Sequence, residues 1–499
     1  MVSRNAPVVI FFNGKSENRY AWALSECTGL VYYKTGVVEE DGNLQTIIRL
    51  PLKQFADRSS FCLTLRIDTG KRSVFETAQQ IAQWWEQDLG MKPLSVPAAA
   101  KEPMYSFWYS YHQNITAQDI EEECVRAKKL GFKTCIIDDG WQTDDNNRGY
   151  AFCGDWEVAT AKIPDMKAHV QAVHELGMKY LIWYSVPYMG FESGHFAEYE
   201  SMLLRRNEGH KTGILDPRYK KVREFLLGIY KKALLEWKLD GFKLDFIDEW
   251  REDPANRPYN PEMDIPVLPE AVKQFMTEVA QTLKEINPEI LLEFRQGYIG
   301  PEMRTFGNMF RVGDCPYDYI KNRVGIFDLR SMMGETAVHS DMLMWHEQEK
   351  PELAALQITS ILFGVMQYSA RLEYMSDEMK KMSRFWMSFM EEHRELLLEA
   401  PLAAYDPHQN YTWAKATDDS ECVACVYAVD KCVLPDSRDR VYVINGCEGE
   451  RVLLELDGVY TGRTLDCYGE IAAEGLEIGG RSIEAVSVPV GGMLVLDKK

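Results

Sequence analysis

Residues 119–141 read DIEEECVRAKKLGFKTCIIDDGW and contain the unit from which the fold is predicted. The first part has apolar residues at helical spacing and stops at Gly131, as helix C-termini prefer. The apolar run TCII follows and ends in two carboxylates, Asp138 and Asp139. A helix followed closely by a short buried strand is typical of parallel sheets covered by helices.

The same alternation continues from 104 to about 390, with further helices expected in KAHVQAVHELG and YKKVREFLLGIYKKALLEWK. Eight strand-like runs predict a central (β/α)8 TIM barrel, since an open doubly wound sheet does not ordinarily reach eight units. The runs are YSFWYSY from 105, TCIIDD from 134, YLIWYSV from 180, GFKLDFI from 241, ILLEFRQ from 290, NMFRVGD from 308, TAVHSD from 336 and ILFGVMQY from 361.

Strand patterns of a different kind flank this region. Residues 1–100 are predicted to form a small N-terminal β domain from VVIFF, YAWALS, LVYYK, TIIRL and FCLTLRI, closed by the helix FETAQQIAQWWEQDL. The proline-containing linker KPLSVPAAAKEP leads into the barrel, predicted over 101–395. Residues 396–499 are predicted to form an antiparallel β-sandwich from YTWAKA, CVACVYAV, RVYVING, RVLLEL, SIEAVSVPV and GMLVLD.

The net charge and the hydropathy of the sequence limit the classes of partner that the protein is expected to bind. The 499 residues carry a net charge of −20 without a basic stripe, which argues against nucleic-acid binding and suits a neutral substrate. No apolar run approaches the about 20 residues of a membrane span, so no membrane partner is expected. The start MVSRNAPVVIFFNG is interpreted as a strand, because Asn13 and Gly14 break its apolar run, and a cytoplasmic location is predicted.

Cofactor motifs are missing from the sequence. The 11 cysteines lack CxxC pairs and zinc-type spacings, so reduced and mostly buried thiols are expected. Neither a GxxxxGKS or GxxxxGKT loop nor a GxGxxG after a strand occurs, and no cofactor or metal is predicted. His339, Asp341 and His346 leave a metal-dependent hydrolase as an alternative, although no HxH or HExxH motif is present.

Polar residues end many of the predicted strands. In a (β/α)8 barrel the carboxyl ends of the strands meet at one mouth, where the chemistry takes place. Five acidic ends would repel each other unless they bind cations, share protons or bind hydroxyl groups, and the interleaved basic residues favour hydroxyls. The candidates are Asp138, Asp139, Lys243, Asp245, Glu293, Arg295, Gln296, Arg311, Asp314 and Asp341.

Aromatic residues lie near the same strand ends. A sugar presents hydroxyl groups that both donate and accept hydrogen bonds, and a C–H face that packs on aromatic rings. Trp108, Trp141 and Trp183 are the aromatic candidates for contact with such a substrate. The mixture of carboxylates, bases and rings therefore predicts a carbohydrate substrate.

Asp245 and Asp314 are the predicted catalytic pair. Retaining glycoside hydrolysis uses two carboxyl groups about 5 to 5.5 Å apart on either side of the glycosidic bond. Asp245 follows Lys243 by two residues on the same side of its strand, so the ammonium should lower the pKa of this carboxyl and keep it ionised as a nucleophile. Partial burial in its loop should keep Asp314 protonated as the general acid.

From 104 to about 345 these motifs resemble those of the melibiase and α-galactosidase hydrolases, a group that includes raffinose-synthase-like transglycosidases. In that group a DDGW motif after the second strand holds the 4- and 6-hydroxyls of galactose, and it matches Asp138, Asp139 and Trp141. The resemblance implies a retaining α-galactosidase that cleaves terminal α-D-galactosyl residues of oligosaccharides or glycoconjugates through a covalent glycosyl-aspartate.

Two further motifs carry the resemblance to catalytic residues. A KxD motif on strand four supplies the nucleophile of the group and matches Lys243 and Asp245. An Arg followed closely by Asp after strand six supplies its acid/base and matches Arg311 and Asp314. Asp318 lies four residues beyond Asp314, where the group more often has a spacing of three, and we favour Asp314.

Two departures leave alternatives open. The N-terminal β domain is shorter than the large β-sandwich typical of bacterial members, so the oligomeric state stays open, with a homo-oligomer as one outcome. After strand five the group has a Cys and a Gly-rich turn, whereas this chain has EFRQG at 293–297. An α-N-acetylgalactosaminidase or another α-glycosidase, a transglycosidase and a catalytically silent carbohydrate-binding protein are the alternatives.

Overall fold

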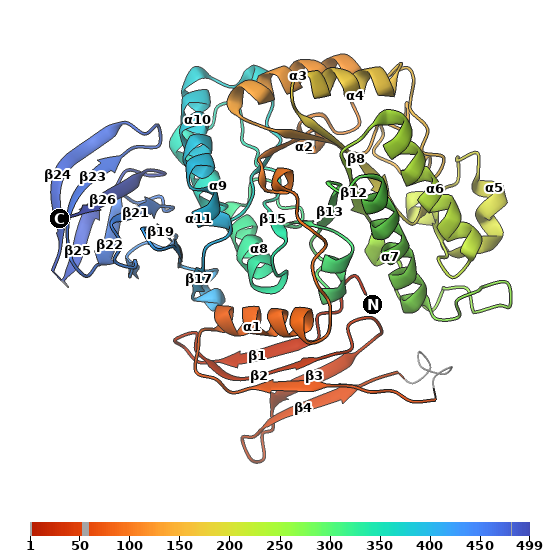
Figure 1. The fold of residues 1–499 in the computed structure, drawn as a ribbon, viewed down its shortest axis with the longest axis horizontal. Helices are drawn as coiled ribbons and strands as arrows, with labels where there is room; N and C mark the ends of the chain where they lie inside the picture. Colours follow the sequence, from red (N-terminus) through yellow and green to blue (C-terminus); the bar gives the residue numbers. More distant parts are fainter. Residues whose placement is uncertain (1, 52–58, 481) are drawn as a thin grey trace.

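The computed structural model describes residues 2–51, 59–480 and 482–499. A parallel barrel forms the centre, with N-terminal sheets on one side and a sheet-rich C-terminal segment on another (Figure 1). The predicted fold class is confirmed. We propose the divisions 1–100, 101–395 and 396–499 as domains, because the first barrel strand starts at Met104 and the first C-terminal strand at Leu402.

Each of the eight predicted runs contributes one parallel barrel strand. The strands pair in the order β15-β14-β13-β12-β8-β7-β6-β16. Parallel bridges of His339 with Val365 and of Leu343 with Tyr368 join the two end strands and nearly close the ring. The strands are β6 (Met104–Ser106), β7 (Thr134–Ile137), β8 (Lys179–Ser185), β12 (Gly241–Asp245), β13 (Leu291–Arg295), β14 (Met309–Arg311), β15 (Ala337–His339) and β16 (Gln367–Tyr368).

Helices cover the outside of the barrel. In α3 a capping box of Thr116 and Asp119 begins the helix, and Gly131, with φ of 114°, ends it as expected. Ile120 and Cys124 of α3 are fully buried against the sheet. The covering helices are α3 (Ala117–Leu130), α4 (Met166–Glu175), α6 (Lys220–Trp237), α7 (Leu268–Ile286), α8 (Tyr319–Met332), α9 (Pro351–Ser360) and α10 (Asp377–Glu392).

The structure differs from the predicted strands at both ends of the barrel sequence. The first strand stops at Ser106, because the following residues form the helical turn α2 (Trp108–Tyr111). The last strand keeps only two residues of ILFGVMQY. A small antiparallel sheet that the periodicity did not reveal is inserted after β8. It comprises β9 (Tyr188–Gly190), β10 (Leu203–Asn207) and β11 (Thr212–Leu215), with α5 (Phe196–Tyr199) in between.

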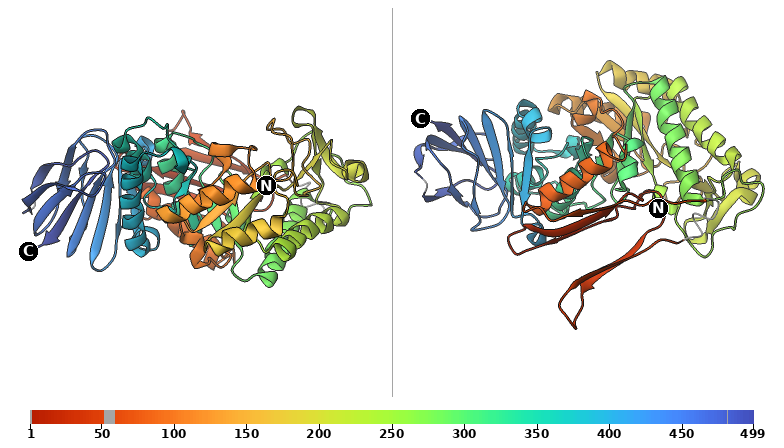
Figure 2. Two further views of the ribbon diagram at one scale, coloured as in Figure 1. Left: turned by 90° about the horizontal axis from the view of Figure 1, so that it is seen from above. Right: turned by 60° about the horizontal axis from the view of Figure 1, so that its bottom comes forward.

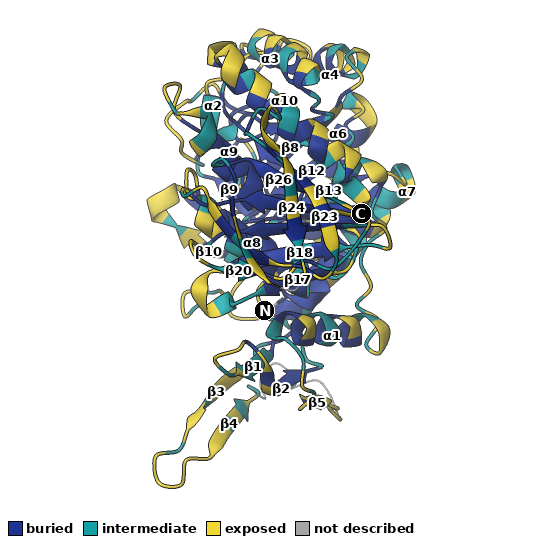
Figure 3. Ribbon diagram, turned by 90° about the vertical axis from the view of Figure 1, so that its left-hand side faces the viewer, coloured by how far each residue is buried: buried dark blue, intermediate teal, exposed yellow. Residues whose placement is uncertain are grey.

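The N-terminal segment has two separate antiparallel sheets. The first has the order β1-β2-β5, and α1 lies between it and the barrel (Figure 1). The second is the hairpin β3-β4, which extends away from the body of the molecule and exposes most of its residues (Figures 2 and 3). The elements are β1 (Val8–Phe12), β2 (Asn18–Leu24), β3 (Tyr32–Val37), β4 (Leu44–Arg49), β5 (Leu65–Asp68) and α1 (Val74–Gln87).

The C-terminal sheets are mixed, where the sequence predicted an antiparallel sandwich. The chain passes from β19 through β20 in the smaller sheet before it returns as β21, so β19 and β21 pair in parallel. The described elements after α10 are α11 (Arg394–Leu398), β17 (Leu402–Tyr405), β18 (Trp413–Thr417), β19 (Glu421–Val426), β20 (Cys432–Val433), β21 (Arg440–Asn445), β22 (Arg451–Glu455), β23 (Val459–Leu465), β24 (Ile471–Gly479), β25 (Ile483–Ser487) and β26 (Met493–Lys498).

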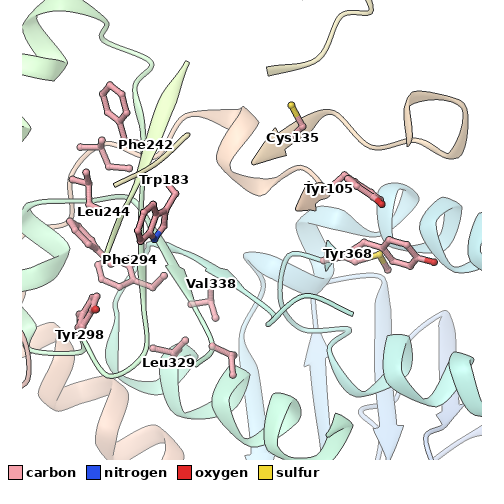
Figure 4. Close-up of a cluster of buried hydrophobic side chains, with 14 of the residues drawn as sticks. Tyr105, Cys135, Trp183, Phe242, Leu244, Phe294, Tyr298, Leu329, Val338 and Tyr368 are labelled. Atoms are coloured by element: carbon pink, nitrogen blue, oxygen red, sulfur yellow. The ribbon is translucent and has the colours of Figure 1, made fainter. Parts of the chain in front are cut away.

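Large apolar side chains from neighbouring strands pack between the barrel and its covering helices. Phe242 and Leu244 of β12 and Phe294 of β13 are at most 1% exposed (Figure 4). The eleven cysteines are free thiols and nine of them are buried, as the sequence predicted. Within the described residues, every helix is too short or too polar to span a membrane.

Gly241, at the start of β12, provides a test of strand packing in the barrel. A Cβ atom there would lie 2.0 Å from the backbone oxygen of Leu291 on β13. Gly241→Ala should therefore destabilise the protein by about 1 to 3 kcal/mol or more, measured by urea unfolding. Gly228→Ala in α6 is the control, because a Cβ atom there would meet nothing within 4 Å beyond the backbone of its own helix. Alanine there should stabilise by about 0.5 to 1 kcal/mol, and equal effects of the two changes would contradict the packing.

Candidate active site

The parallel register of the strands aligns the polar residues at one end of the barrel. Lys243 of β12 pairs with Glu293 of β13, and Arg295 of β13 pairs with Arg311 of β14. Side chains two apart on a strand share a face, so Asp245 joins Lys243 on the same face. Strand ends far apart in the sequence therefore place acids and bases around one mouth.

Asp245 is buried, with only 6% of its surface exposed. Its Oδ1 accepts hydrogen bonds from Arg295 Nε and the Tyr298 hydroxyl, both at 2.7 Å. Its Oδ2 accepts one from Trp183 Nε1 at 3.1 Å. Burial alone would raise the pKa of Asp245, but the charges of Arg295 and Lys243 and these hydrogen bonds lower it well below the usual range. The carboxylate is held ionised at the base of the mouth.

Asp138 and Lys243 form a buried ion pair next to this carboxylate. Nζ of Lys243 donates to Oδ2 of Asp138, and both side chains are at most 6% exposed. Two charges removed from water in this way are stable only because they compensate each other. Lys243 thereby links the second strand to the fourth.

Asp139 is held by two amide side chains. Oδ2 accepts a hydrogen bond from Gln113 Nε2 at 2.7 Å, and Oδ1 accepts one from Gln142 Nε2 at 2.6 Å. Burial raises the pKa of Asp139 to about 6, although both amides and the charge of Lys162 oppose the shift. The two aspartates of the DDGW motif thus have different surroundings, one paired with a cation and one with neutral donors.

Arg311, at the end of β14, is the basic residue around which the acids of strands five to seven gather. It is 1% exposed, and its Nη1 donates to Asp341 Oδ1 while its Nη2 donates to Asp314 Oδ1 at 2.9 Å. Glu293 lies 3.6 Å from Arg311 Nε and is fully buried. One guanidinium therefore faces three carboxyl groups, from strands five, six and seven.

Asp314 differs from its predicted environment. Its side chain is 52% exposed, where the sequence predicted a partly buried carboxyl that stays protonated. Burial would raise the pKa of Asp314, but the charges of Arg311 and Lys243 and the Arg311 hydrogen bond lower it. Asp318, the competing candidate, instead caps α8 by accepting a hydrogen bond from the backbone N–H of Lys321 at 2.9 Å.

Glu293 and Gln296 lie on the wall formed by strand five. Gln367 Nε2 donates to Glu293 Oε2, and burial raises the pKa of Glu293 against the charges of Arg311 and Lys243. The backbone N–H of Gln296 donates to the Arg311 carbonyl at 2.7 Å. Glu293 thus supports the mouth from beneath, and Gln296 ties two strand ends together.

The three candidate tryptophans occupy different positions. Trp183 reaches Asp245 directly, whereas Trp141 is fully buried and donates from Nε1 to the Trp183 carbonyl at 3.0 Å. Trp141 therefore has a supporting position in the core, where the sequence predicted contact with substrate. Trp108 is partly exposed, and the Arg148 guanidinium lies 5.3 Å from its ring centre.

Sequence reasoning missed the neutral hydrogen-bond partners of the charged residues. Tyr298, Gln113, Gln142 and Gln367 were not singled out, although all of them lie on or shortly after barrel strands. Their position relative to strand ends was the available signal. Which acidic residue each of these side chains contacts depends on the path of the loops in the folded protein.

The surroundings of His339 do not support the alternative of a metal-dependent hydrolase. This side chain is fully buried, its Nε2 lies 2.7 Å from the Ala100 carbonyl oxygen, and burial lowers its pKa to about 4. His346 is exposed. In the part of the chain that the structure describes, no group of three or more His, Cys, Asp or Glu side chains could hold a metal ion.

The arrangement suits chemistry on a neutral polyhydroxylated molecule. It offers an ionised carboxylate at the base, a second carboxyl open to solvent, and several donors and acceptors between them. Residues 100–309 match the Melibiase family model. The match makes this segment similar to the melibiase family.

Curated α-galactosidases are similar to part of this chain. α-Galactosidase Mel36A of Lactobacillus acidophilus is 24% identical over 294 residues, which cover 54% of this chain and 38% of that protein. α-Galactosidase 1 of Pediococcus pentosaceus is 29% identical over 127 residues, 24% of this chain and 17% of that protein. The matches thus span well under half the length of these relatives.

Solved structures resemble the whole chain in fold. The GH36 α-galactosidase AgaB of Geobacillus stearothermophilus has a TM-score of 0.70 at 14% identity, covering 99% of this chain and 68% of that chain. A variant of AgaA from the same organism, solved with raffinose, has a TM-score of 0.66 at 13% identity, covering 99% and 72%. At this identity the likeness establishes the fold alone.

The Asp138–Lys243 pair can be tested through stability. Lys243→Met should cost about 3 to 5 kcal/mol, because it leaves Asp138 buried without its counter-charge. Asp138→Asn in the same chain should recover part of this loss, so the double variant should cost less than the sum of the single variants. Urea unfolding measures all three, and additive costs would show that the two side chains do not interact.

Proposed function

We propose that the chain is a retaining α-glycoside hydrolase, an α-galactosidase that cleaves terminal α-D-galactosyl residues. The observation that carries the proposal is the buried, ionised Asp245, oriented by Arg295, Tyr298 and Trp183. The match of residues 100–309 to the Melibiase model and the similarity to α-galactosidases support the choice of sugar. Neighbours in fold solved with raffinose and stachyose support an oligosaccharide substrate.

Asp245 acts as the nucleophile. It attacks the anomeric carbon and forms a covalent glycosyl-aspartate while the bond to the leaving group breaks. The hydrogen bonds to both of its oxygens fix the direction of attack, and its lowered pKa keeps it ionised at neutral pH. Water then attacks the anomeric carbon and releases the sugar with its configuration retained.

Asp314 acts as general acid and then as general base. It donates a proton to the glycosidic oxygen in the first step and takes a proton from water in the second. In the free protein Arg311 favours its ionised form. A bound sugar covers this exposed carboxyl, and the loss of water raises its pKa toward the value that an acid catalyst needs.

The remaining polar residues bind the sugar or hold those that do. Asp138 and Asp139 accept hydrogen bonds from sugar hydroxyls, and Lys243 and Arg295 donate to ring oxygens or hydroxyls. The buried Arg311 orients Asp314 and Asp341. Trp108 and Trp183 provide aromatic surface, while Glu293, Gln296 and Trp141 support the walls of the mouth. We further place the protein in the cytoplasm, which its eleven free thiols support.

The proposal is tested with aryl α-glycosides of galactose, N-acetylgalactosamine, glucose and arabinopyranose. Wild type should cleave the galactoside, and Asp245→Ala should lower kcat at least about 10⁴-fold, because the nucleophile is lost. Azide should rescue this variant and yield a glycosyl azide. Unchanged activity in Asp245→Ala would reject the assignment, and cleavage of the N-acetylgalactosaminide alone would reject the sugar.

Asp314 and Asp318 form a matched pair for the acid/base. Asp314→Asn should lower kcat/KM of the aryl galactoside about 10²- to 10⁴-fold through loss of proton transfer. Asp318→Asn should retain activity and lose at most about 1 kcal/mol of stability, since it alters only a helix cap. The reverse pattern would assign the acid/base role to Asp318.

Arg295 should set the acid limb of the pH profile. Arg295→Met removes a cation that lowers the pKa of Asp245, so that pKa rises and the nucleophile becomes protonated at higher pH. The acid limb of kcat/KM should move upward by about one unit or more. Arg251→Met, at an exposed arginine paired with Glu249, should leave the limb in place. An unmoved limb in Arg295→Met would contradict the role of this cation.

A further inference from the structure

Residues 2–5, which precede β1, lie against two loops at the carboxyl end of the barrel. One of these loops follows β12 and the other follows β13. Val2 is fully buried in the main hydrophobic core. Ser3 is 2% exposed, and its carbonyl accepts a hydrogen bond from the backbone N–H of Gly300, in the loop after β13, at 3.1 Å. Segment 2–5 is therefore packed into the structure beside the mouth.

Arg4 connects the two loops. Its guanidinium forms an ion pair with Asp248, three residues after Asp245 in the loop that follows β12. A Cβ atom added to Gly297 would lie 4.0 Å from Arg4 Nε, so the arginine also lies beside the loop after β13. The Asp248 side chain is only 11% exposed, and Arg4 is the one basic side chain paired with it among the described residues. A carboxylate buried to this degree depends on its counter-charge.

The loop after β13 carries Tyr298, which contacts the proposed nucleophile. The Tyr298 hydroxyl donates to Asp245 Oδ1 at 2.7 Å and accepts a hydrogen bond from the backbone N–H of Phe246 at 2.6 Å. The two glycines beside segment 2–5 stand on either side of this tyrosine in the sequence. A shift of the loop would therefore move a hydrogen bond that directs the carboxylate.

The N-terminal sheets hold both the segment and this loop. Asn5 Nδ2 donates to the carbonyl of Gly29 at 2.8 Å and to that of Glu26 at 3.2 Å, both in the turn between β2 and β3. From the same turn, Thr28 Oγ1 donates to Glu302 Oε1 at 2.6 Å, in the short helix that follows the loop after β13. The N-terminal domain thus fixes the position of the loop from two directions.

We propose that segment 2–5 holds the active-site loops in place and that Arg4 is a positioning residue for Asp245, acting through the loop that carries Tyr298. The inference rests on the proposed function, because it takes Asp245 as the nucleophile. The loop concerned is the one at which the sequence EFRQG departs from the Cys and Gly-rich turn of the group. The N-terminal domain thereby contributes to the reaction.

The test is a double-variant cycle on kcat with an aryl α-galactoside. Arg4→Met should lower kcat about tenfold and leave KM nearly unchanged, because a misplaced Tyr298 weakens the attack of Asp245 more than the binding of the sugar. Tyr298→Phe should lower kcat about ten- to a hundredfold, since a hydrogen bond to the carboxylate is lost. The double variant should be no slower than Tyr298→Phe, because Arg4 acts through this hydroxyl.

Two further variants serve as controls. Arg4→Lys keeps a cation opposite Asp248 and should retain kcat within about threefold of wild type. Arg451→Met removes an arginine of similar exposure that is paired with Asp430 in the C-terminal sheets, and it should have wild-type kinetics. Thermal unfolding checks that each variant folds. If Arg4→Met does not fold, Asp248→Asn takes its place in the cycle, because it removes the same ion pair.

The outcomes separate the positioning role from the proposed function. If wild type cleaves no aryl α-glycoside, or if Asp245→Ala stays active, the proposed function fails and the role of Arg4 is rejected with it. If Arg4→Met loses only thermal stability and keeps the kcat of wild type, Arg4 is structural and only the positioning role is rejected. The same holds if the losses in Arg4→Met and Tyr298→Phe multiply in the double variant, or if Arg4→Lys loses as much as Arg4→Met.

Discussion

The arrangement of the site depends on one constraint: the acidic side chains at the barrel mouth must be offset by nearby basic side chains. Five acidic side chains come from strand ends that converge on one small volume: Asp138, Asp245, Glu293, Asp314 and Asp341. Lys243, Arg295 and Arg311 offset them, and each cation contacts acids from other strands. A buried charge without a partner is costly, so the strand register must bring these residues together for the barrel to be stable.

The same contacts explain why acids at one mouth have different proton affinities. Asp245 has two cations and two neutral donors, and its pKa falls despite burial. Asp139 has only amide partners close by, and burial raises its pKa to about 6. Asp341 shares Arg311 with Asp314, so the exposed carboxyl does not receive the whole charge of that guanidinium. The different pKa values of these carboxyl groups thus follow from their neighbours rather than from residue type.

Much of the fold was predictable, because strand and helix periodicities are local properties. All eight barrel strands were predicted from apolar runs, and the Gly131 helix end from its position. The β9-β10-β11 sheet was missed, since its strands are short and pair only across intervening loops. The parallel β19-β21 pair was also missed, because a crossover through β20 leaves no local signal.

The sequence by itself determined the barrel, the convergence of polar strand ends and the identity of the candidate acids, because strand direction alone sends those residues to one mouth. Only the tertiary structure decided which groups touch. It placed Trp141 inside the core, gave Asp245 the Tyr298 hydroxyl, left Asp314 exposed and made Asp318 a helix cap. Contacts between distant residues depend on loop paths and strand register, and exposure depends on everything packed around a side chain. Neither property is encoded in any short stretch of sequence.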